Sequence, residues 1–235
     1  KQVLENAPET ILNASIQESI QSESVSSLRE LLNKLGVSIQ IVPRVALNRM
    51  VKNQNHQGIL LEVQKKTKKT ERDLDDILAQ NQDANPLYLI LDSIQDPHNL
   101  GACIRTANAV GVTAVIIPND RAANINETVR KVASGAVENV VVVNVVNLVR
   151  AIKKIKESGV WVVGTTGDTE QSIYALDLKI PTAIVMGGEG KGMRDSVQKE
   201  CDYVASIPIN GQVGSLNVSV AAGVVLYEVI RQRGT

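Results

Sequence analysis

The chain has very few aromatic residues: one tryptophan, four tyrosines and no phenylalanine among its 235 residues. A binding face built on the stacking of bases against aromatic rings is therefore not expected. The two cysteines, Cys103 and Cys201, cannot build a disulfide scaffold or a cysteine-rich zinc site. The two histidines, His56 and His98, do not suffice for a histidine-based metal centre. We therefore expect no metal cofactor.

An excess of one charge and long apolar runs are also missing. The 25 Lys and Arg residues balance 25 Asp and Glu residues, so any contact with nucleic acid must use a local basic patch. No apolar run approaches the roughly 18 residues that span a bilayer, and the first residues do not form a signal peptide. Because 43% of the residues are hydrophobic, a core can form. The composition predicts a soluble cytoplasmic α/β protein with no membrane partner.

Two parts of the chain differ in their sequence pattern. The first part mixes helix-like spacing over residues 16–35 with strand-like alternation over residues 37–42. The stretch that follows is polar and charged and ends at Pro86, which is typical of a connecting segment. The sequence thus predicts a first domain over 1–75, a linker over 76–86 and a second domain over 87–235. We expect an incomplete N-terminus because the chain begins with lysine.

After Pro86, short β-branched segments alternate with amphipathic ones. This alternation predicts a mostly parallel sheet covered by helices on both faces. The predicted strands are 88–91, 114–117, 140–145, 160–163, 182–186 and 203–207, and the predicted helices are 100–110, 125–133, 147–158, 194–200 and 217–231. Ligands of such sheets lie beyond the carboxyl ends of the strands, so the loops that follow strands are the place to look for chemistry.

Three such loops stand out. In the first, residues 91–105, Asn99 can cap the following helix, and Arg105 lies about 600° further round it. The second, residues 185–193, has four glycines in six residues and a central Glu189 but does not match a phosphate-binding Walker loop. The third, residues 206–219, runs into the last helix, with Ser215 or Asn217 as its N-cap. Taken singly, each loop is also typical of an ordinary strand-to-helix connection.

Together and in this order, the three loops resemble the motifs of the SpoU branch of the SPOUT RNA methyltransferases. The matching segments are Asp96-Pro-His-Asn-Leu-Gly-Ala-Cys-Ile-Arg105, Val185-Met-Gly-Gly-Glu-Gly-Lys-Gly192 and the stretch from Ile207 to Ser219. The resemblance covers residues 87–231. Residues 1–75, with His56-Gln-Gly-Ile59, resemble the small ribosomal-protein-like RNA-binding domain that precedes the catalytic domain in some members of this family.

The resemblance implies the fold, the donor and the partners. It implies a trefoil knot in the C-terminal domain, a rare exception to unthreaded chain connections, and a homodimer formed through that domain whose two subunits complete the active sites. It implies S-adenosyl-L-methionine as methyl donor and the ribose 2′-hydroxyl of a guanosine in 23S ribosomal RNA as acceptor. Two alternatives stay open, namely a transfer-RNA guanosine 2′-O-methyltransferase and a non-catalytic RNA-binding or ribosome-assembly factor.

The resemblance also implies roles for individual residues. Arg105 is expected to meet the 2′-hydroxyl, and the residues expected to organise the site are Asn99, Glu189, Ser215 and Asn217. The residues expected to bind the donor are Thr165, Met186, Gly187, Gly188, Ile207, Pro208, Ile209 and Leu216, with Gly187, Ile207 and Leu216 acting through backbone groups. The basic residues Lys65, Lys66, Lys68, Lys69 and Arg72 either bind RNA phosphates or form a solvated connector.

Methyl transfer needs alignment of the 2′-oxygen with the methyl carbon and removal of a proton from a weak acid. An arginine that serves as the base must first be neutral, and neutralising a guanidinium near pH 7 costs about 8 kcal/mol. Arg105 can instead hold the oxygen and stabilise the developing alkoxide. The sequence leaves both roles open.

Overall fold

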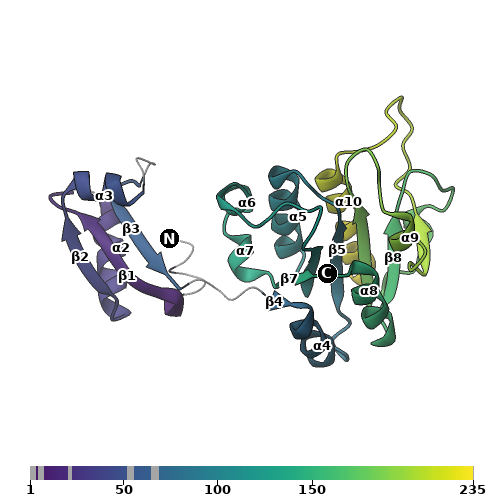
Figure 1. Cartoon of the computed structure of the whole chain (residues 1–235), viewed down its shortest axis with the longest axis horizontal. Helices are drawn as coiled ribbons and strands as arrows, with labels where there is room; N and C mark the ends of the chain where they lie inside the picture. The colour runs from purple at the N-terminus through teal and green to yellow at the C-terminus, as the bar shows by residue number, and fades with distance from the viewer. Residues whose placement is uncertain (1–3, 5–7, 21–22, 52–55, 65–68, 235) are drawn as a thin grey trace. The chain divides into compact units, whose positions relative to one another are not determined.

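The computed structural model of the chain describes residue 4 and residues 8–20, 23–51, 56–64 and 69–234 (Figure 1). The chain divides into two compact units, Lys1–Thr67 and Lys68–Thr235. Each unit has its own hydrophobic core, so each is described by itself. No helix among the described residues is long and apolar enough to cross a membrane.

The first unit is a small α/β fold around a three-stranded sheet in the order β2-β1-β3. The central strand β1 pairs in parallel with β2 and antiparallel with β3. Ala14 and Ile16 of β1 point to one face and pack with Val25 and Leu32, which lie on a helix. The elements are η1 (Pro8–Thr10), β1 (Ile11–Gln17), α2 (Glu23–Lys34), β2 (Ser38–Val42), α3 (Arg44–Met50) and β3 (Ile59–Val63).

The second unit is built on a seven-stranded sheet in the order β10-β8-β9-β5-β6-β7-β4. All of its strand pairs among the described residues are parallel, as the alternation of strands and helices predicts. Its strands are β4 (Lys69–Thr70), β5 (Leu87–Asp92), β6 (Ala114–Pro118), β7 (Val142–Val145), β8 (Trp161–Thr165), β9 (Thr182–Gly187) and β10 (Tyr203–Ala205).

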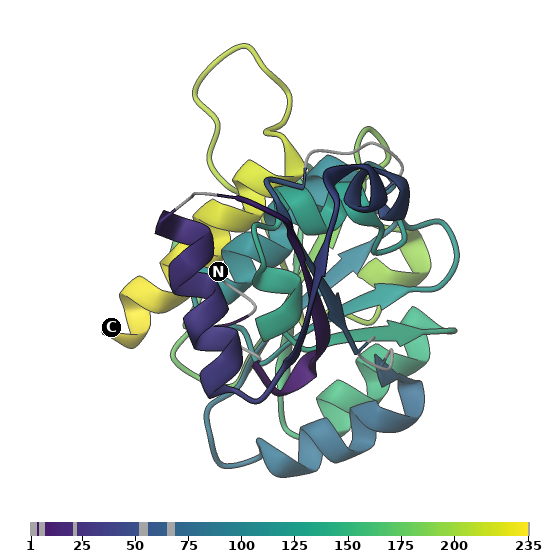
Figure 2. The ribbon, with the colours of Figure 1, turned by 90° about the vertical axis from the view of Figure 1, so that its left-hand side faces the viewer.

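Helices cover both faces of this sheet, because the side chains of a buried parallel strand are apolar on both sides. In β5, Leu89 and Leu91 pack on one face, whereas Tyr88 and Ile90 pack on the other. The first face carries α5 (Pro97–Ala109), α6 (Glu127–Val132), α7 (Ala136–Asn139) and α10 (Val218–Arg233), and the second carries α4 (Glu71–Gln80), α8 (Leu148–Glu157) and α9 (Asp195–Gln198). Figure 2 shows α10 beside α5, against which it packs.

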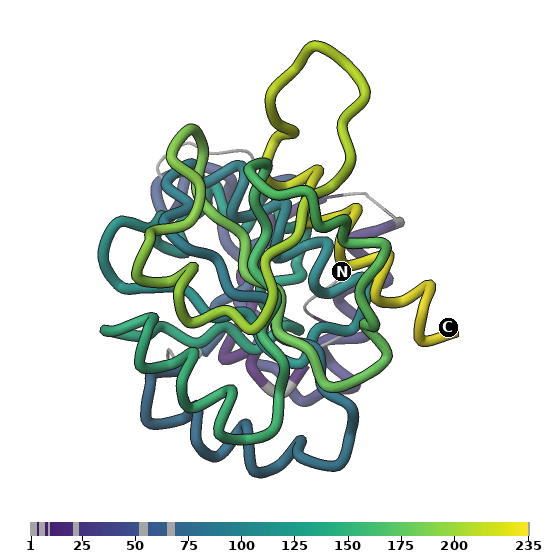
Figure 3. The backbone as a smooth tube through the Cα atoms, turned by 90° about the vertical axis from the view of Figure 1, so that its right-hand side faces the viewer, coloured from purple at the N-terminus to yellow at the C-terminus, as the bar shows by residue number. Residues whose placement is uncertain are grey.

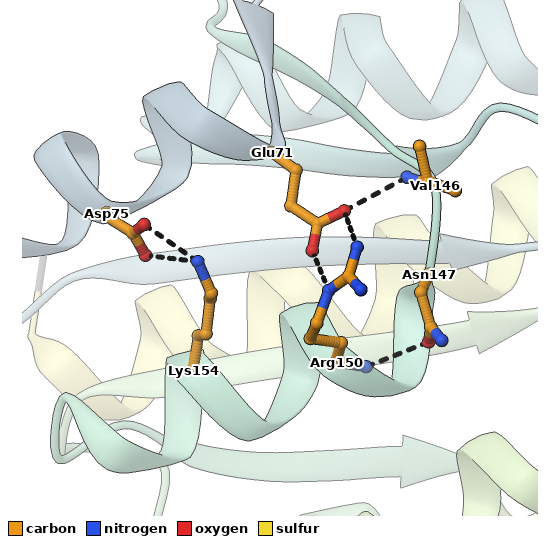
Figure 4. A network of polar contacts seen from close by, with 6 residues as sticks. All are labelled: Glu71, Asp75, Val146, Asn147, Arg150 and Lys154. Carbon is orange, nitrogen blue, oxygen red and sulfur yellow. Dashed lines mark hydrogen bonds and ion pairs between the residues drawn. The ribbon is translucent and has the colours of Figure 1, made fainter.

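The boundary between the units differs from the predicted linker over 76–86. Residues 71–80 form α4, and this helix belongs to the second unit. Its polar sequence hides two apolar side chains one turn apart, Leu74 and Leu78, which are buried in the core of that unit. Ion pairs also join α4 to α8: Glu71 pairs with Arg150, and Asp75 pairs with Lys154 (Figure 4).

The carboxyl ends of the strands carry the loops that position the site. The segment between β10 and α10 projects from the second unit as a long loop (Figures 2 and 3). The described part of the chain confirms the predicted parallel sheet with helices on both faces. The trefoil knot stays a prediction.

Candidate active site

A cavity of about 640 Å³ lies beyond the carboxyl ends of β8 and β9, between the glycine-rich loop and the start of α10. Seven of the eight residues predicted to bind the donor line it: Thr165, Met186, Gly187, Gly188, Ile207, Ile209 and Leu216. Pro208, the eighth, is exposed and is not among the lining residues that the structure describes. Segments that lie far apart in the sequence therefore form one cavity.

The glycine loop, residues 187–193, needs its glycines for two different reasons. A Cβ on Gly187 would lie 2.2 Å from the backbone of Gly192, and one on Gly188 would lie 2.5 Å from the Ser93 carbonyl oxygen. Gly190 and Gly192 have φ angles of +78° and +65°, which favour glycine. The loop folds back on itself, and the Gly192 N–H donates to the Gly188 oxygen at 3.0 Å. Its backbone can thus approach a ligand closely.

A polar cluster next to the cavity joins all three predicted motifs. The Asn99 side-chain amide donates to Glu189 Oε1, and the Asn217 amide donates to Asn99 Oδ1 at 3.0 Å. Asn99 lies in the first turn of α5, Glu189 in the glycine loop and Asn217 at the start of α10. Glu189 and Asn217 also line the cavity, as does Ser215.

The helix caps agree with the prediction at one helix and correct it at another. Asn217 is the N-cap of α10, and its Oδ1 accepts from Ser219 N at 2.9 Å. The N-cap of α5 is Asp96 rather than Asn99, because Asp96 Oδ1 accepts from His98 N at 2.9 Å. Pro97, whose fixed φ suits the first helical position, follows this cap directly. Asn99 is thereby free to bind Glu189.

Arg105 lies apart from the cavity in the single chain. It is exposed on α5, and no hydrogen bond or ion pair joins it to another residue in the part of the chain that the structure describes. Asn99 and Arg105 are six residues apart on one helix, so they point to different sides. Arg105 is thus not among the residues that line the cavity, and its expected contact with the 2′-hydroxyl stays a prediction.

The basic residues of the predicted RNA-binding segment are only partly described. Lys65, Lys66 and Lys68 lie outside the described residues. Lys69 pairs with Asp73 at 3.0 Å, whereas Arg72 is exposed. Hydrogen bonds from the Thr70 backbone and from Lys69 lower the pKa of Asp73 to about 2.

The two cysteines are not placed as nucleophiles. Cys103 is buried and Cys201 is partly buried. Burial raises the pKa of both thiols to about 12, so both are protonated near pH 7. Within the described ranges, no group of three or more His, Cys, Asp or Glu side chains could hold a metal ion.

A sequence model of the SpoU rRNA Methylase family matches residues 86–227. The chain belongs to this family. A second model, described as the substrate-binding domain of RNA 2′-O ribose methyltransferases, matches residues 1–69. The two matches follow the two units of the structure. The match to the methylase family begins at residue 86, beyond the end of α4.

Similar proteins cover almost the whole length of this SpoU family member. The 23S rRNA (guanosine-2′-O-)-methyltransferase RlmB of Vibrio parahaemolyticus is 46% identical over 233 residues, which cover 99% of this chain and 94% of the relative. The relative of the same name from Haemophilus influenzae is 44% identical over 98% of this chain and 94% of its own length. The AdoMet-bound rRNA methyltransferase structure from Sinorhizobium meliloti has a TM-score of 0.79 at 23% identity, covering 100% of this chain and 86% of that one. At that identity the likeness shows the fold alone.

Sequence reasoning missed two charged residues beside the glycine loop, Asp92 and Arg194. Asp92 is completely buried, and its carboxylate pairs with the Arg194 guanidinium at 2.7 Å. Asp92 ends a strand whose other five residues are apolar or aromatic. A single carboxylate at the end of such a strand is the sequence signal that could have indicated it. Polar residues that line the cavity were also missed: Thr166, Asp168, Lys191, Asp195 and Gln198.

Proposed function

We propose that this SpoU family member transfers a methyl group from S-adenosylmethionine to the ribose 2′-hydroxyl of a guanosine in 23S ribosomal RNA. The observation that carries the proposal is one cavity of about 640 Å³ lined by the second and third motif loops, with Asn99 of the first motif hydrogen-bonded to Glu189 and Asn217 of its lining. A cavity of this volume is within the size range of cofactor sites. The substrate is supported by relatives of 44–46% identity that are named as 23S rRNA guanosine 2′-O-methyltransferases.

The residues around the cavity fit S-adenosylmethionine. The glycine loop offers backbone groups at positions where a Cβ would collide with neighbouring backbone, while Met186, Ile207 and Leu216 supply apolar surface for the adenosyl group. In this assignment Gly187, Ile207 and Leu216 bind the donor through their backbones, and Thr165, Gly188, Pro208 and Ile209 complete the pocket. Bound S-adenosylmethionine supplies a methyl group that its sulfonium has already activated.

The protein's own contribution is to orient the acceptor and to handle its proton. Asn99, Glu189 and Asn217 form a hydrogen-bonded row at the edge of the cavity, and Ser215 lines the same cavity next to Leu216. A fixed row of this kind holds a ribose in one orientation, which is a large part of the rate gain in a bimolecular transfer. Arg105 holds the 2′-oxygen and stabilises the negative charge that develops on it as the hydroxyl proton passes to solvent water.

The proposal includes a homodimer formed through the C-terminal domain, in which the second subunit completes each active site. Two observations support it. Arg105 is not among the residues that line the cavity of its own chain, and α10 exposes two apolar side chains on one face, Val220 at 53% and Tyr227 at 56%. Exposed apolar side chains on one helix face are suited to an interface. The trefoil knot and the cytoplasmic location belong to the same proposal.

A 23S ribosomal RNA target is favoured over transfer RNA. Residues 1–69 match a substrate-binding domain, and a large structured RNA needs recognition outside the catalytic pocket. The contact of Asn99 with both Glu189 and Asn217 favours an enzyme over a non-catalytic assembly factor, because it unites all three motifs. The basic residues of segment 65–72 are assigned to RNA phosphates in this proposal.

Mapping of ribose methylation in ribosomal RNA from cells with and without the gene tests the proposal. We expect one guanosine in 23S rRNA to lose its 2′-O-methyl group when the gene is deleted and to regain it on complementation. If the 23S rRNA pattern is unchanged and a transfer RNA loses a methyl group instead, the substrate is transfer RNA and not 23S rRNA. An unchanged pattern in all RNA would contradict the enzymatic assignment.

A further inference from the structure

The carboxylate of Asp92 is the most deeply buried charge beside the active site, although the residue does not belong to the three motifs. Its side chain has 0% exposure. It accepts three hydrogen bonds, from Arg194 N at 2.8 Å, from Arg194 Nε at 2.7 Å and from Ser93 Oγ at 3.0 Å. A carboxylate this deeply buried is stable only when it is fully paired, so these contacts define a fixed point of the structure.

Asp92 contacts the protein at both ends of the glycine loop. At the beginning of the loop, Asp92 of β5 is the register partner of Gly187 of β9. At its end, Arg194 directly follows Met193, the last residue of the loop, and binds the Asp92 carboxylate with both its backbone and its side chain. One residue therefore ties down the first and the last turn of the loop that lines the cavity.

The backbone of Ser93 packs directly against Gly188 of the same loop. It has a φ angle of +66°, a conformation that serine rarely adopts. In this conformation its carbonyl lies so close to Gly188 that a Cβ there would be 2.5 Å from the oxygen. The Ser93 hydroxyl donates to Asp92 Oδ1, so the carboxylate also fixes the position of Ser93 against the loop.

A glycine-rich loop needs such a tie because its own residues supply few side chains to pack. Four of the six residues from Gly187 to Gly192 are glycines, and glycine has the largest backbone freedom to lose. The loop must nevertheless hold its backbone against the cavity and hold Glu189 against Asn99. Neither Asp92 nor Arg194 lines the cavity in the described part of the chain.

We propose that Asp92 and Arg194 are positioning residues that set the conformation of the glycine loop and thereby the affinity for the methyl donor and the alignment of Glu189. The identity of the donor in this inference rests on the proposed function. The pair acts through the loop and touches neither the donor nor the RNA. Its loss therefore weakens donor binding and slows methyl transfer, while the KM for RNA stays the same.

The chain offers a matched control near the edge strand β4 of the sheet, three strands away from β5. Glu71 is a partly buried carboxylate whose side chain is 15% exposed, and it likewise accepts from an arginine side chain, that of Arg150, and from a backbone N–H, that of Val146 (Figure 4). It lies beside β4, which is at the far end of the strand order from β8 and β10. Glu71→Gln therefore removes a comparable charge without touching the glycine loop.

The test uses the full chain and compares Asp92→Asn, Arg194→Gln and Arg194→Lys with Glu71→Gln. Calorimetry with S-adenosylmethionine gives the Kd, and methyl transfer to a 23S rRNA fragment gives kcat and KM. Hydrogen exchange over residues 187–194, measured without donor, reports the loop directly. We expect Asp92→Asn and Arg194→Gln to raise the donor Kd at least tenfold, to lower kcat and to speed exchange of the loop amides. Arg194→Lys should recover part of each loss, and Glu71→Gln should stay within twofold of the wild type in donor Kd.

The outcomes separate this inference from the proposed function. If Asp92→Asn and Arg194→Gln keep the wild-type Kd and loop exchange, the pair has only a general structural role and the inference is overturned. If Asp92→Asn does not fold, Arg194→Gln decides by the same two readouts. If the wild type neither binds S-adenosylmethionine nor methylates RNA, the proposed function fails, whereas loop exchange still shows whether the pair positions the loop.

Discussion

The buried carboxylates of the second unit have hydrogen-bond donors close by. Asp92 has three donors, and Glu228, which is 6% exposed, accepts from Arg231 and Gln232. These hydrogen bonds, first of all that from Arg231, lower the pKa of Glu228 despite its burial. Among the described residues, the Tyr88 hydroxyl is the one buried side-chain polar atom without a hydrogen-bond partner. The buried hydroxyl of Tyr88 therefore lowers the free energy of unfolding, because it lost its hydrogen bonds to water on folding and gained none in the protein.

Replacement of Tyr88 by phenylalanine is expected to leave the protein equally stable or to stabilise it by about 1 kcal/mol, because it removes a buried hydroxyl that has no partner. Urea unfolding near pH 7 measures the difference in the free energy of unfolding. A loss of more than about 1 kcal/mol would mean that the hydroxyl does have a partner.

The same substitution makes a prediction for alkaline pH. Burial raises the pKa of Tyr88 from 10.0 to about 12. Between these values the unfolded chain loses the proton while the folded chain keeps it, so the stability of the wild type falls as the pH rises from 10 to 12. Tyr88→Phe lacks this contribution, and its unfolding free energy should fall less steeply over that range. Parallel slopes for the two proteins would contradict the assigned cause.

At the scale of elements, α10 connects the fold to the site. Its N-cap, Asn217, uses its two side-chain atoms for different purposes: Oδ1 caps the helix, and the amide nitrogen binds Asn99. The start of the helix and the polar row are thus held by one residue. Two substitutions can separate these functions, because aspartate keeps the oxygen and alanine removes both atoms.

Asn217→Asp should keep the unfolding free energy within about 0.5 kcal/mol of the wild type, since Asp is as good an N-cap as Asn. It should still slow methyl transfer, because the donor to Asn99 Oδ1 is lost. Asn217→Ala should lose about 1 kcal/mol of stability as well as activity. Thermal unfolding and single-turnover transfer measure the two effects. An Asn217→Asp variant of wild-type activity would remove the polar row from the mechanism.

Elements are also the level at which sequence reasoning succeeds or fails. The strand–helix alternation after residue 87 is confirmed, because apolar segments such as Leu87–Asp92 fit only a sheet buried on both faces. The helix α4 was missed, since its charged sequence hides Leu74 and Leu78. In the first unit, helix-like spacing from residue 16 to residue 35 includes the end of β1, because periodicity alone cannot find where a helix begins.

The site was predictable only as far as its motifs extend. Seven of the eight residues expected to bind the donor line the cavity, and six of these seven lie in the motifs; their binding of the donor stays a prediction. The pairing of Asp92 with Arg194 spans 102 residues, and no local spacing reveals such a contact. The place of Arg105 relative to the cavity was not predictable from local sequence either, since in the proposed dimer it depends on how the two chains assemble.

At the scale of the whole molecule, assembly is the decisive question. Tyr227→Glu on the exposed face of α10 is expected to convert the proposed dimer to a monomer, because it places a charge in an apolar interface. Light scattering measures the mass, and transfer should fall at least tenfold when the mass halves. Tyr174→Glu is the control, because Tyr174 is 49% exposed and lies on η2 (Ile173–Ala175) rather than on α10. A Tyr227→Glu protein of unchanged mass would place the interface elsewhere.

In the proposed function, this chain moves a methyl group from S-adenosylmethionine to a guanosine ribose, and Arg105 acts in the transfer. The most direct measurement is the transfer of labelled methyl groups to a 23S rRNA fragment by the wild type and by Arg105→Ala, with the donor Kd of each measured by calorimetry. We expect a labelled 2′-O-methylguanosine with the wild type. With Arg105→Ala we expect transfer at least a hundredfold slower, at a donor Kd within twofold of the wild type. No labelled ribose with the wild type, or equal rates for both proteins, would contradict this proposal.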